Sequence, residues 1–317
     1  MKLYNLMSFG KELRAIRENN HLTQSKVSKI LGISEDTLRR LENGKSIPKL
    51  ETLDYLSVVY KTDIHMVLAK SRLTYSFVFK NDIHRLNEMI ISKDYSCIDE
   101  AIDNINKVFD QEESRPSYSL MIDKLKQFKK TAELFAEFDL QKNDDDLLLD
   151  YYNEIVKTLS ISLIEFSINN INNYSFDYIE MRLLLLLCEV SRQLSLLEDC
   201  IKILDALETN IARFTEITDE FNEILIKTYF HQSYVYHRID DFDNIITYAD
   251  KGINYSLKIK DYSIIHLFFF RKGAALYSLD KNDEANVYFK KCLSAIYITD
   301  NEKLYRQFEN IIKTKYS

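Results

Sequence analysis

The chain has 317 residues, 46% of them hydrophobic, so its length allows two or three domains with sizeable cores. Only 5 glycines and 2 prolines interrupt it, which favours an all-α fold over a turn-rich β architecture. Although the net charge is −7, residues 1–70 carry 12 basic against 8 acidic side chains, so the acidic total does not exclude nucleic-acid binding by this segment.

Five short helices are predicted in residues 1–70. Phe9, Leu13 and Ile16 place an apolar stripe on the first of them. Pro48 opens the fourth element, and the fifth follows it directly. The residues of these last two helices that are expected to face the core are Leu53, Leu56, Val59, Ile64, Val67 and Leu68.

The second and third helices have strong start and stop signals. Thr23 is a good N-cap for the second helix, and Gly32 supplies the left-handed conformation that ends it. Ser34 can cap a third helix that runs to Asn43, and Gly44 ends that helix. Two short helices across a tight, glycine-containing turn are typical of a helix-turn-helix unit.

Residues Leu22–Lys45 follow the pattern L-T-Q-x-x-[LV]-[AS]-x-x-[LI]-G-[IV]-S-x-x-[TS]-[LI]-x-x-[LIF]-E-N-G-K almost position by position. The segment therefore resembles the lambda-repressor-like (Cro/C1, or XRE) family, and the resemblance covers residues 8–70. It implies a DNA-binding domain at residues 1–70, with the second helix of the unit in the major groove of double-stranded DNA. It also implies that two heads read an inverted-repeat operator.

The resemblance also assigns roles to individual positions. The implied DNA-binding residues are Gln24, Ser34, Glu35, Asp36, Thr37, Arg39, Arg40, Asn43 and Lys45. Within this set Glu35, Asp36, Thr37 and Arg40 are the base-reading candidates, whereas Arg39 and Lys45 favour phosphates. Gln24 matches a glutamine that contacts the DNA backbone, and Asn43 matches a loop residue near the phosphates. Arg17 and Glu42 match an internal ion pair that faces away from DNA.

Two carboxylates at the start of the third helix depart from the pattern of many relatives. Glu35 and Asp36 can accept hydrogen bonds from cytosine amino groups, although they repel phosphate. Alternatively, they only favour the positive end of the helix dipole. The sequence leaves both interpretations open.

Beyond a linker at residues 71–81, residues 82–317 are expected to be almost entirely helical. Small and large residues recur there at tetratricopeptide spacing, in registers displaced by 45 and then 40 positions. The three registers are Leu184, Cys188, Ser191, Cys200, Leu204 and Leu207; Tyr229, Ser233, Tyr236, Ile245, Ala249 and Gly252; and Phe269, Gly273, Leu276, Ala285, Phe289 and Cys292. They predict a tetratricopeptide-like α-solenoid. A non-repeat helical bundle is the alternative, since such stripes also form ordinary cores.

Weaker helix pairs are expected at residues 82–110 and 118–172, and a capping helix at residues 300–316. The acidic stretch Asp144–Asp146 is interpreted as a solvated loop between helices.

A helix-turn-helix head on such a body resembles the Rgg/Rap/NprR/PlcR/PrgX family of peptide-pheromone receptors of Gram-positive bacteria. The resemblance implies a homodimer that binds a short signalling peptide in its concave groove. Repeat positions 2, 5, 9 and 12 of tetratricopeptide motifs point into that groove. The corresponding peptide-binding candidates are Arg182, Leu185, Glu189, Arg192, Lys227, Phe230, Tyr234, His237, Leu267, Phe270, Ala274 and Tyr277. A basic residue at position 2 of two adjacent repeats suits a peptide carboxylate.

The remaining features of the sequence exclude other classes of protein. The four cysteines are scattered without a C-x-x-C pair and the six histidines lack metal-ligand spacing, so neither a metal nor a cofactor is expected. Phosphate-loop, nucleophile-elbow and zinc-protease motifs are absent from the sequence, so no enzyme is expected. No secretory signal or membrane-length apolar run is visible, which predicts a soluble, cytoplasmic protein.

The leading hypothesis is thus a transcription regulator that senses a peptide in quorum sensing. The alternatives are a helix-turn-helix regulator that senses a protein or small molecule, and an interaction scaffold that does not bind DNA.

Overall fold

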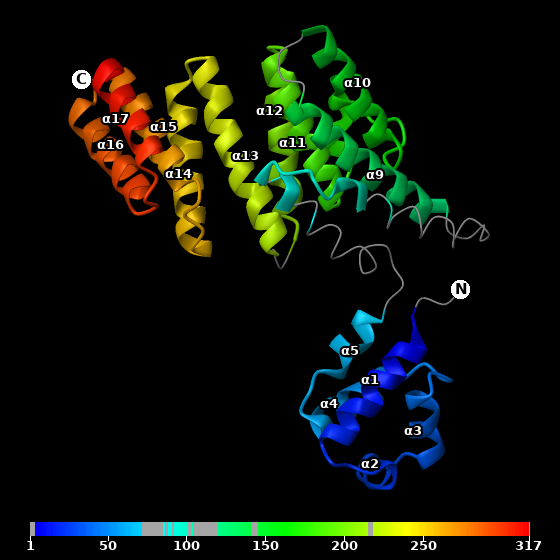
Figure 1. The fold of residues 1–317 in the computed structure, drawn as a ribbon. Coiled ribbons are helices and arrows are strands. Elements are labelled where there is room, and N and C mark those ends of the chain that lie inside the picture. Colours follow the sequence, from blue (N-terminus) through cyan, green and yellow to red (C-terminus); the bar gives the residue numbers. More distant parts are fainter. Residues whose placement is uncertain are drawn as a thin grey trace. The chain divides into compact units, whose positions relative to one another are not determined.

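The computed structural model describes residues 4–71, 85, 88–90, 92–100, 103, 119–140, 145–214 and 218–316. The chain divides into two compact units, Met1–Leu125 and Lys126–Ser317. The secondary-structure elements of the described ranges are helices (Figure 1), which confirms the predicted all-α fold. Across those ranges, no helix combines the length and the apolar character that crossing a membrane requires. Most of the predicted linker at residues 71–81 and of the predicted helix pair at residues 82–110 lies outside the described residues.

The N-terminal part of the first unit contains the five predicted helices. They are α1 (Leu6–Asn19), α2 (Gln24–Leu31), α3 (Glu35–Glu42), α4 (Leu50–Tyr60) and α5 (Ile64–Lys70). Their shared core consists of Phe9, Leu13, Val27, Leu38, Leu41, Leu53, Leu56, Tyr60, Ile64 and Val67. Burial of these apolar side chains is the main force that holds such short helices together, because isolated helices of this length are unstable in water.

The helix-turn-helix geometry follows from the cap residues. The Thr23 hydroxyl accepts a hydrogen bond from the Lys26 amide at 3.1 Å, and the Ser34 hydroxyl accepts one from the Thr37 amide at 3.1 Å. Gly32 ends α2 in the left-handed conformation with φ of 66°. These contacts confirm the predicted starts of α2 and α3 and the turn between them.

The second unit consists of helices that follow one another in space as they do in sequence (Figure 1). It begins within α9 (Ser119–Leu140) and continues with α10 (Asp145–Ser160) and the short 3₁₀ helix η2 (Ile168–Asn173). Then come α11 (Tyr178–Gln193), α12 (Leu197–Ile211), α13 (Asp219–Arg238), α14 (Phe242–Ile259), α15 (Ile265–Ser278), α16 (Asn282–Tyr297) and α17 (Glu302–Lys315). Helix α17 lies within residues 300–316, where the sequence predicted a terminal helix.

One predicted loop is wrong in part. Asp145 and Asp146 are the first residues of α10 and do not belong to a connecting loop; Asp144 lies outside the described residues. Carboxylates are favourable in the first turn of a helix because they face its positive dipole end. The same acidic residues that indicated solvation therefore also suit a helix start.

The repeats pack through small residues that face aromatic rings. A Cβ on Gly273 of α15 would lie 2.8 Å from ring atoms of Phe289 on α16, and one on Gly252 of α14 would lie 2.3 Å from the ring of Phe268 on α15. The first contact joins the two helices of one pair, and the second joins adjacent pairs. The first helices α11, α13 and α15 also contact each other in turn. This arrangement confirms the predicted repeat architecture.

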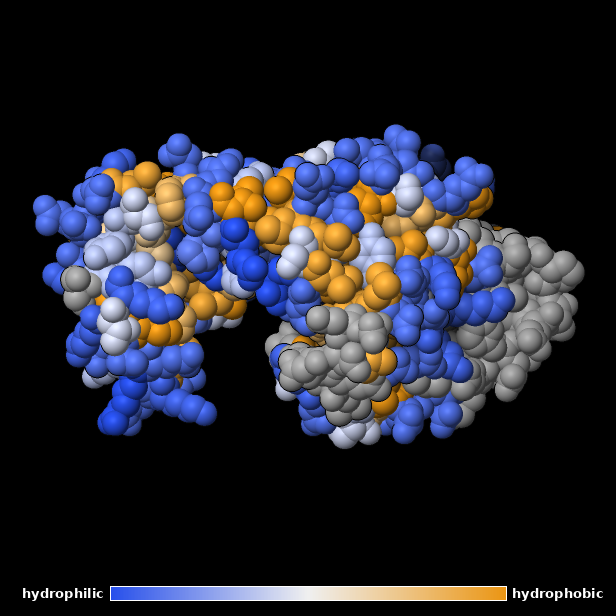
Figure 2. All heavy atoms as spheres, turned by 90° about the horizontal axis from the view of Figure 1, so that it is seen from above, coloured by the Kyte–Doolittle hydropathy of each residue, from blue (hydrophilic) through white to orange (hydrophobic). Residues whose placement is uncertain are grey.

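Figure 2 shows apolar residues gathered in patches between hydrophilic ones on the face seen from above. Individual exposed apolar side chains of the second unit include Val287 and Ile298, which are 50% and 83% exposed.

Candidate DNA interface and inner helices of the repeats

Helix α3 has one anchored side and one open side. Leu38 and Leu41 are 0% and 2% exposed and belong to the core, so they fix the helix on the domain. The predicted DNA-binding residues that are exposed are Ser34, Glu35, Asp36, Thr37, Arg39, Arg40, Asn43 and Lys45. The structure thus brings these eight residues together around α3 on the surface of the first unit. Such a surface helix has the dimensions that fit the major groove.

Gln24 is half-buried and is bound inside the domain. Its side-chain amide donates a hydrogen bond to Glu42 Oε2 at 2.8 Å. Arg17 donates to the same carboxylate from Nε at 2.6 Å and from Nη2 at 3.0 Å, and from Nη1 to the Leu22 carbonyl at 2.8 Å. The hydrogen bond with Glu42 raises the pKa of Arg17. This network confirms the Arg17–Glu42 pair and ties α1, α2 and α3 to one another.

Asp36 has a partner on its own helix. Arg39 donates to Asp36 Oδ1 at 2.5 Å, and both side chains are more than half exposed. Exposed pairs of this kind contribute little to stability. The pair nevertheless masks part of the charge of Arg39, which was predicted to bind phosphate. Glu35 and Asp36 also lie in the first turn of α3, where carboxylates favour the helix dipole.

Gly10 sets the distance between α1 and α3. A Cβ at this position would lie 2.4 Å from the Glu42 carbonyl oxygen, which belongs to the backbone and cannot rotate away. We therefore expect Gly10→Ala to destabilise the first unit by about 1–3 kcal/mol, the usual effect of overpacking. Chemical denaturation of the full chain would measure the loss. Gly32→Ala is the comparison in which only backbone strain acts, because Gly32 has a positive φ and nothing lies within 4 Å of a Cβ there. Unchanged stability in Gly10→Ala would contradict the close-packing argument.

The first helices of the three repeats, α11, α13 and α15, are called the inner helices. They carry all twelve predicted peptide-binding residues, but not all of these residues are exposed. Arg182 is 1% exposed, donates from Nε to the Tyr178 hydroxyl at 2.8 Å, and donates from Nη2 to Glu223 Oε2 at 2.7 Å. Lys227 Nζ lies 2.6 Å from Glu223 Oε1. The two predicted basic residues of adjacent repeats therefore share one carboxylate inside the protein. Leu185 and Ala274 are also buried, at 7% and 4% exposed.

A second charged cluster lies farther along the same helices. Arg192 of α11 forms a bidentate ion pair with Glu189 and donates to the Tyr234 hydroxyl of α13 at 3.4 Å. The Arg192 guanidinium carbon lies 5.0 Å from the Tyr234 ring centre. On α15, the guanidinium carbon of Arg271 lies 4.6 Å from the centre of the same ring. Arg271 was not predicted; it directly follows the predicted Phe270 within the apolar run Phe268–Phe270.

The last repeat is covered in part by the capping helix. The ring of Phe270 meets those of Phe308 and Tyr316 at centroid distances of 5.1 and 5.9 Å, and the ring of Tyr277 lies 5.3 Å from Tyr316. Leu267 packs against the cluster that contains Phe308. Three of the predicted peptide-binding residues thus contact α17 or the residue that follows it.

The remaining predicted positions, Phe230 and His237 of α13, are half-buried. Burial lowers the pKa of His237, and the neighbouring cations Arg271, Arg238 and Lys315 lower it further, against Asp240. Burial likewise lowers the pKa of His231, to about 4, which keeps this imidazole neutral. The end of the inner surface near Arg271 is therefore rich in positive charge.

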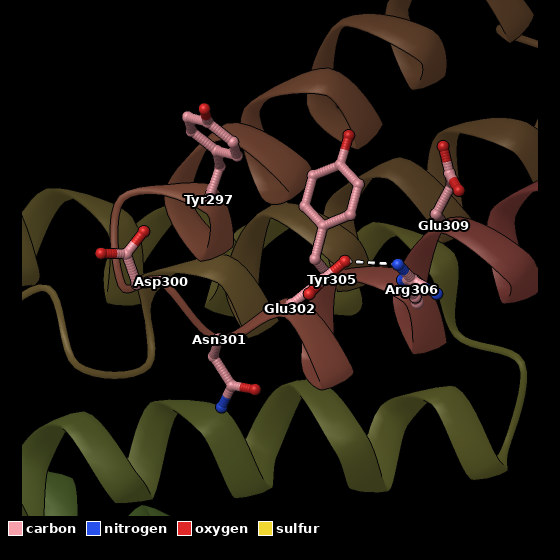
Figure 3. A pocket seen from close by; sticks show the side chains of 7 residues that line it. All are labelled: Tyr297, Asp300, Asn301, Glu302, Tyr305, Arg306 and Glu309. Atoms are coloured by element: carbon pink, nitrogen blue, oxygen red, sulfur yellow. Dashed lines mark hydrogen bonds and ion pairs between the residues drawn. The ribbon is translucent and has the colours of Figure 1, made fainter.

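Further hollows of the described residues lie outside the predicted peptide surface. A groove of about 650 Å³ between α14, α15 and α16 is lined mainly by apolar residues such as Leu257 and Val287. A pocket of about 530 Å³ at the junction of α16 and α17 is lined by two tyrosines and several carboxylates, and its Glu302 pairs with Arg306 (Figure 3).

Comparison with known proteins finds relatives of the five-helix part of the first unit. The helix-turn-helix family model matches residues 13–65. The ImmF control region 10 kDa protein of Bacillus phage phi105 is 32% identical over 62 residues, which are 18% of this chain and 69% of the phage protein. The HTH-type transcriptional repressor RghR of Bacillus subtilis is 35% identical over 65 residues, which are 20% of this chain and 48% of the repressor. The match therefore spans about half the length of that repressor.

The similarity to one solved structure extends over nearly the whole chain. A crystal structure of Bacillus thuringiensis PlcR in complex with the peptide PapR7 and DNA is similar with a TM-score of 0.62 and 17% identity. The alignment covers 98% of this chain and 100% of the PlcR chain. At this level of identity the similarity shows a shared fold, that of a helix-turn-helix head followed by helical repeats.

Proposed function

We propose that this chain, which belongs to the helix-turn-helix family through its first unit, is a DNA-binding transcription regulator controlled by a short signalling peptide. The observation that carries the proposal is the similarity to PlcR over 98% of the chain, since the PlcR structure holds both DNA and a peptide. In this proposal residues 1–70 bind DNA and residues 82–317 bind the peptide and form a homodimer. The chain acts by binding and not as an enzyme.

The surface of α3 supports the DNA-binding half of the proposal. Its core side is anchored by Leu38 and Leu41, and its open side carries the nine-residue set apart from the half-buried Gln24. Arg40 is the strongest base-reading candidate, because it is exposed and has no ion-pair partner among the described residues, whereas Arg39 is paired with Asp36. In a homodimer two copies of α3 would read the two halves of an inverted repeat.

We expect Arg40→Ala to lose about 1–3 kcal/mol of binding free energy at one base pair and to relax the preference at that position. The operator would first be selected from a random DNA library, and affinities would then be measured for all of its single-base variants at several salt concentrations. Lys45→Ala is the control: it should weaken all sequences alike and flatten the salt dependence. An equal loss on every sequence from Arg40→Ala would contradict a base-reading role.

The inner helices support the peptide-binding half. Four of the predicted residues are half-buried, so packing holds their side chains in place while part of each stays open to a ligand. These residues are Arg192, Phe230, Tyr234 and His237. Arg182, Leu185 and Ala274 have little exposed surface, and we propose that they shape the surface from beneath. Glu189, Lys227, Leu267, Phe270 and Tyr277 complete the proposed set.

Two experiments separate this function from the alternatives. Salt-sensitive binding of the full chain to a selected DNA site, together with a dimer mass in light scattering, would exclude an interaction scaffold that does not bind DNA. Mass spectrometry of the chain purified from its native host would then show whether a short peptide, a small molecule or a protein accompanies it. Recovery of only a small molecule or a protein would overturn peptide control and leave DNA binding intact.

A further inference from the structure

Three side chains from three successive repeats form one stack on the inner helices. The ring of Tyr234 on α13 lies within 5.0 Å of the guanidinium carbon of Arg192 on α11 and within 4.6 Å of that of Arg271 on α15. Such distances allow cation–π attraction between each guanidinium and the ring. One tyrosine therefore contacts two arginines, one from each of the repeats that flank its own, and it orients both.

The two arginines differ in how their charge is compensated. Arg192 has a bidentate partner in Glu189, and the hydrogen bond with that carboxylate raises the pKa of Arg192. Among the described residues Arg271 has no carboxylate partner, and burial lowers its pKa, although electrostatic interaction with Tyr234 and Tyr316 raises it in part. An aromatic face attracts a cation but offers no acceptor to the five guanidinium N–H groups. Arg271 thus retains donors for a negatively charged group.

The surroundings of Arg271 add to this positive field. His237 lies on the same helix as Tyr234. The cations Arg271, Arg238 and Lys315 lower the pKa of His237, and the carboxylate of Asp240 raises it. This end of the inner surface is cationic although residues 71–317 as a whole are acidic. Burying a charge without a partner is unfavourable, so a ligand anion would compensate Arg271, which has no carboxylate partner among the described residues.

We propose that Arg271, oriented by Tyr234, binds a carboxylate of the signalling peptide. The inference rests on the proposed function for the existence of the peptide, but its chemistry is that of any ligand carboxylate. The planar guanidinium fork matches a carboxylate in bidentate geometry. The carboxylate is either the C-terminus of the peptide or an acidic side chain, and the experiment distinguishes the two.

The first part of the experiment does not need the peptide. The full chain is titrated with N-acetylglycine, a minimal carboxylate, and with N-acetylglycinamide as the uncharged match, while the arginine Nε–H signals are followed by NMR. The Arg271 signal is assigned by its loss in Arg271→Gln. We expect N-acetylglycine to shift this signal and the amide to leave it in place. No shift with N-acetylglycine would overturn the proposal, whatever the chain binds otherwise.

The second part identifies the source of the carboxylate. Binders are selected on the wild-type chain from a library of random seven-residue peptides, and each is compared with its C-terminal amide and with versions in which Asp and Glu become Asn and Gln. Removal of the correct carboxylate should weaken binding about tenfold or more in the wild-type chain. The same change should have little effect in Arg271→Gln, because the partner is already absent.

Stability separates a ligand-binding arginine from a structural one. Arg271→Gln should leave the melting temperature unchanged or raise it, since it removes an uncompensated charge. Arg306→Gln is the matched control, because it removes the same charge from an exposed ion pair on α17 and should leave peptide affinity unchanged. Peptides that bind wild type and Arg271→Gln equally would overturn the inference while supporting peptide control. If no peptide is selected but N-acetylglycine still shifts the Arg271 signal, the result would support the anion site and count against peptide control.

Discussion

Glu42→Ala is expected to lower the free energy of unfolding of the first unit by about 3–5 kcal/mol. The Glu42 side chain is 2% exposed and accepts hydrogen bonds from Arg17 and Gln24. Its removal leaves the Arg17 guanidinium, whose side chain is 8% exposed, with only the more distant and half-exposed Glu18 carboxylate, 3.4 Å from Nη2, as a countercharge. The three helices that the network joins would lose their common contact, so DNA binding should fall with stability.

Hydrogen exchange of the full chain, measured by mass spectrometry on peptides from residues 4–71, would report the opening free energy of this unit alone. Glu18→Ala is the matched control, because its ion pair with Arg14 is exposed and its contact with Arg17 is long, at 3.4 Å, so its removal should cost at most about 1 kcal/mol. Comparable losses in the two variants would show that the Glu42 network does not hold the helices together. Replacing both Arg17 and Glu42 by apolar residues should recover much of the stability, since no buried charge then remains unpaired.

Glu223→Ala is expected to destabilise the second unit by a similar amount, about 3–5 kcal/mol. Glu223 is the carboxylate shared by Arg182 and Lys227, at 2.7 and 2.6 Å. Without it the buried Arg182 guanidinium and the Lys227 ammonium would repel each other across the gap between α11 and α13. The pKa of Lys227, already lowered by burial and by Arg182, should fall further because Glu223 raises it.

Thermal unfolding of the full chain with exchange data for residues 126–316 would measure this effect. Glu302→Ala, which breaks the exposed pair with Arg306 on α17, is the control and should change stability by less than about 1 kcal/mol. If Glu223→Ala unfolds no more easily than the control, the shared carboxylate is not structural. The same result would restore Arg182 as a candidate for direct peptide contact.

The ion pair between Arg182 and Glu223 joins two of the inner helices, so a variant of Arg182 changes packing as well as the inner surface. Because Arg182 holds α11 to α13, weaker peptide binding in Arg182→Ala would follow from altered packing even without a direct contact. Arg271 offers a cleaner test, since its replacement removes no ion pair that the described residues form.

The sequence by itself determined the five helices of residues 4–71, the starts of α2 and α3 and the repeated helix pairs from α11 to α16. Thr23, Ser34 and Gly32 act within one or two turns of their own position, so the cap and turn geometry follows from local spacing. The recurrence of small residues such as Gly273 opposite large ones such as Phe289 likewise predicted the repeats, because close helix packing requires that pairing. The Arg17–Glu42 pair was implied only through the resemblance to a family.

Tertiary structure alone decided which basic residues of the repeats are compensated. Repeat spacing placed Arg182 on the groove, but its partner Glu223 lies 41 positions away, and only the packing of α11 on α13 brings the two together. The repeat spacing did not predict Arg271. This residue belongs to the repeat that follows the repeat of Tyr234, and its guanidinium contacts the Tyr234 ring. A local sequence pattern, which spans one or two helical turns, determines the face of the helix on which a side chain lies. The charge of that side chain is compensated by groups distant in sequence, so its availability for a ligand is known only once the helices have packed.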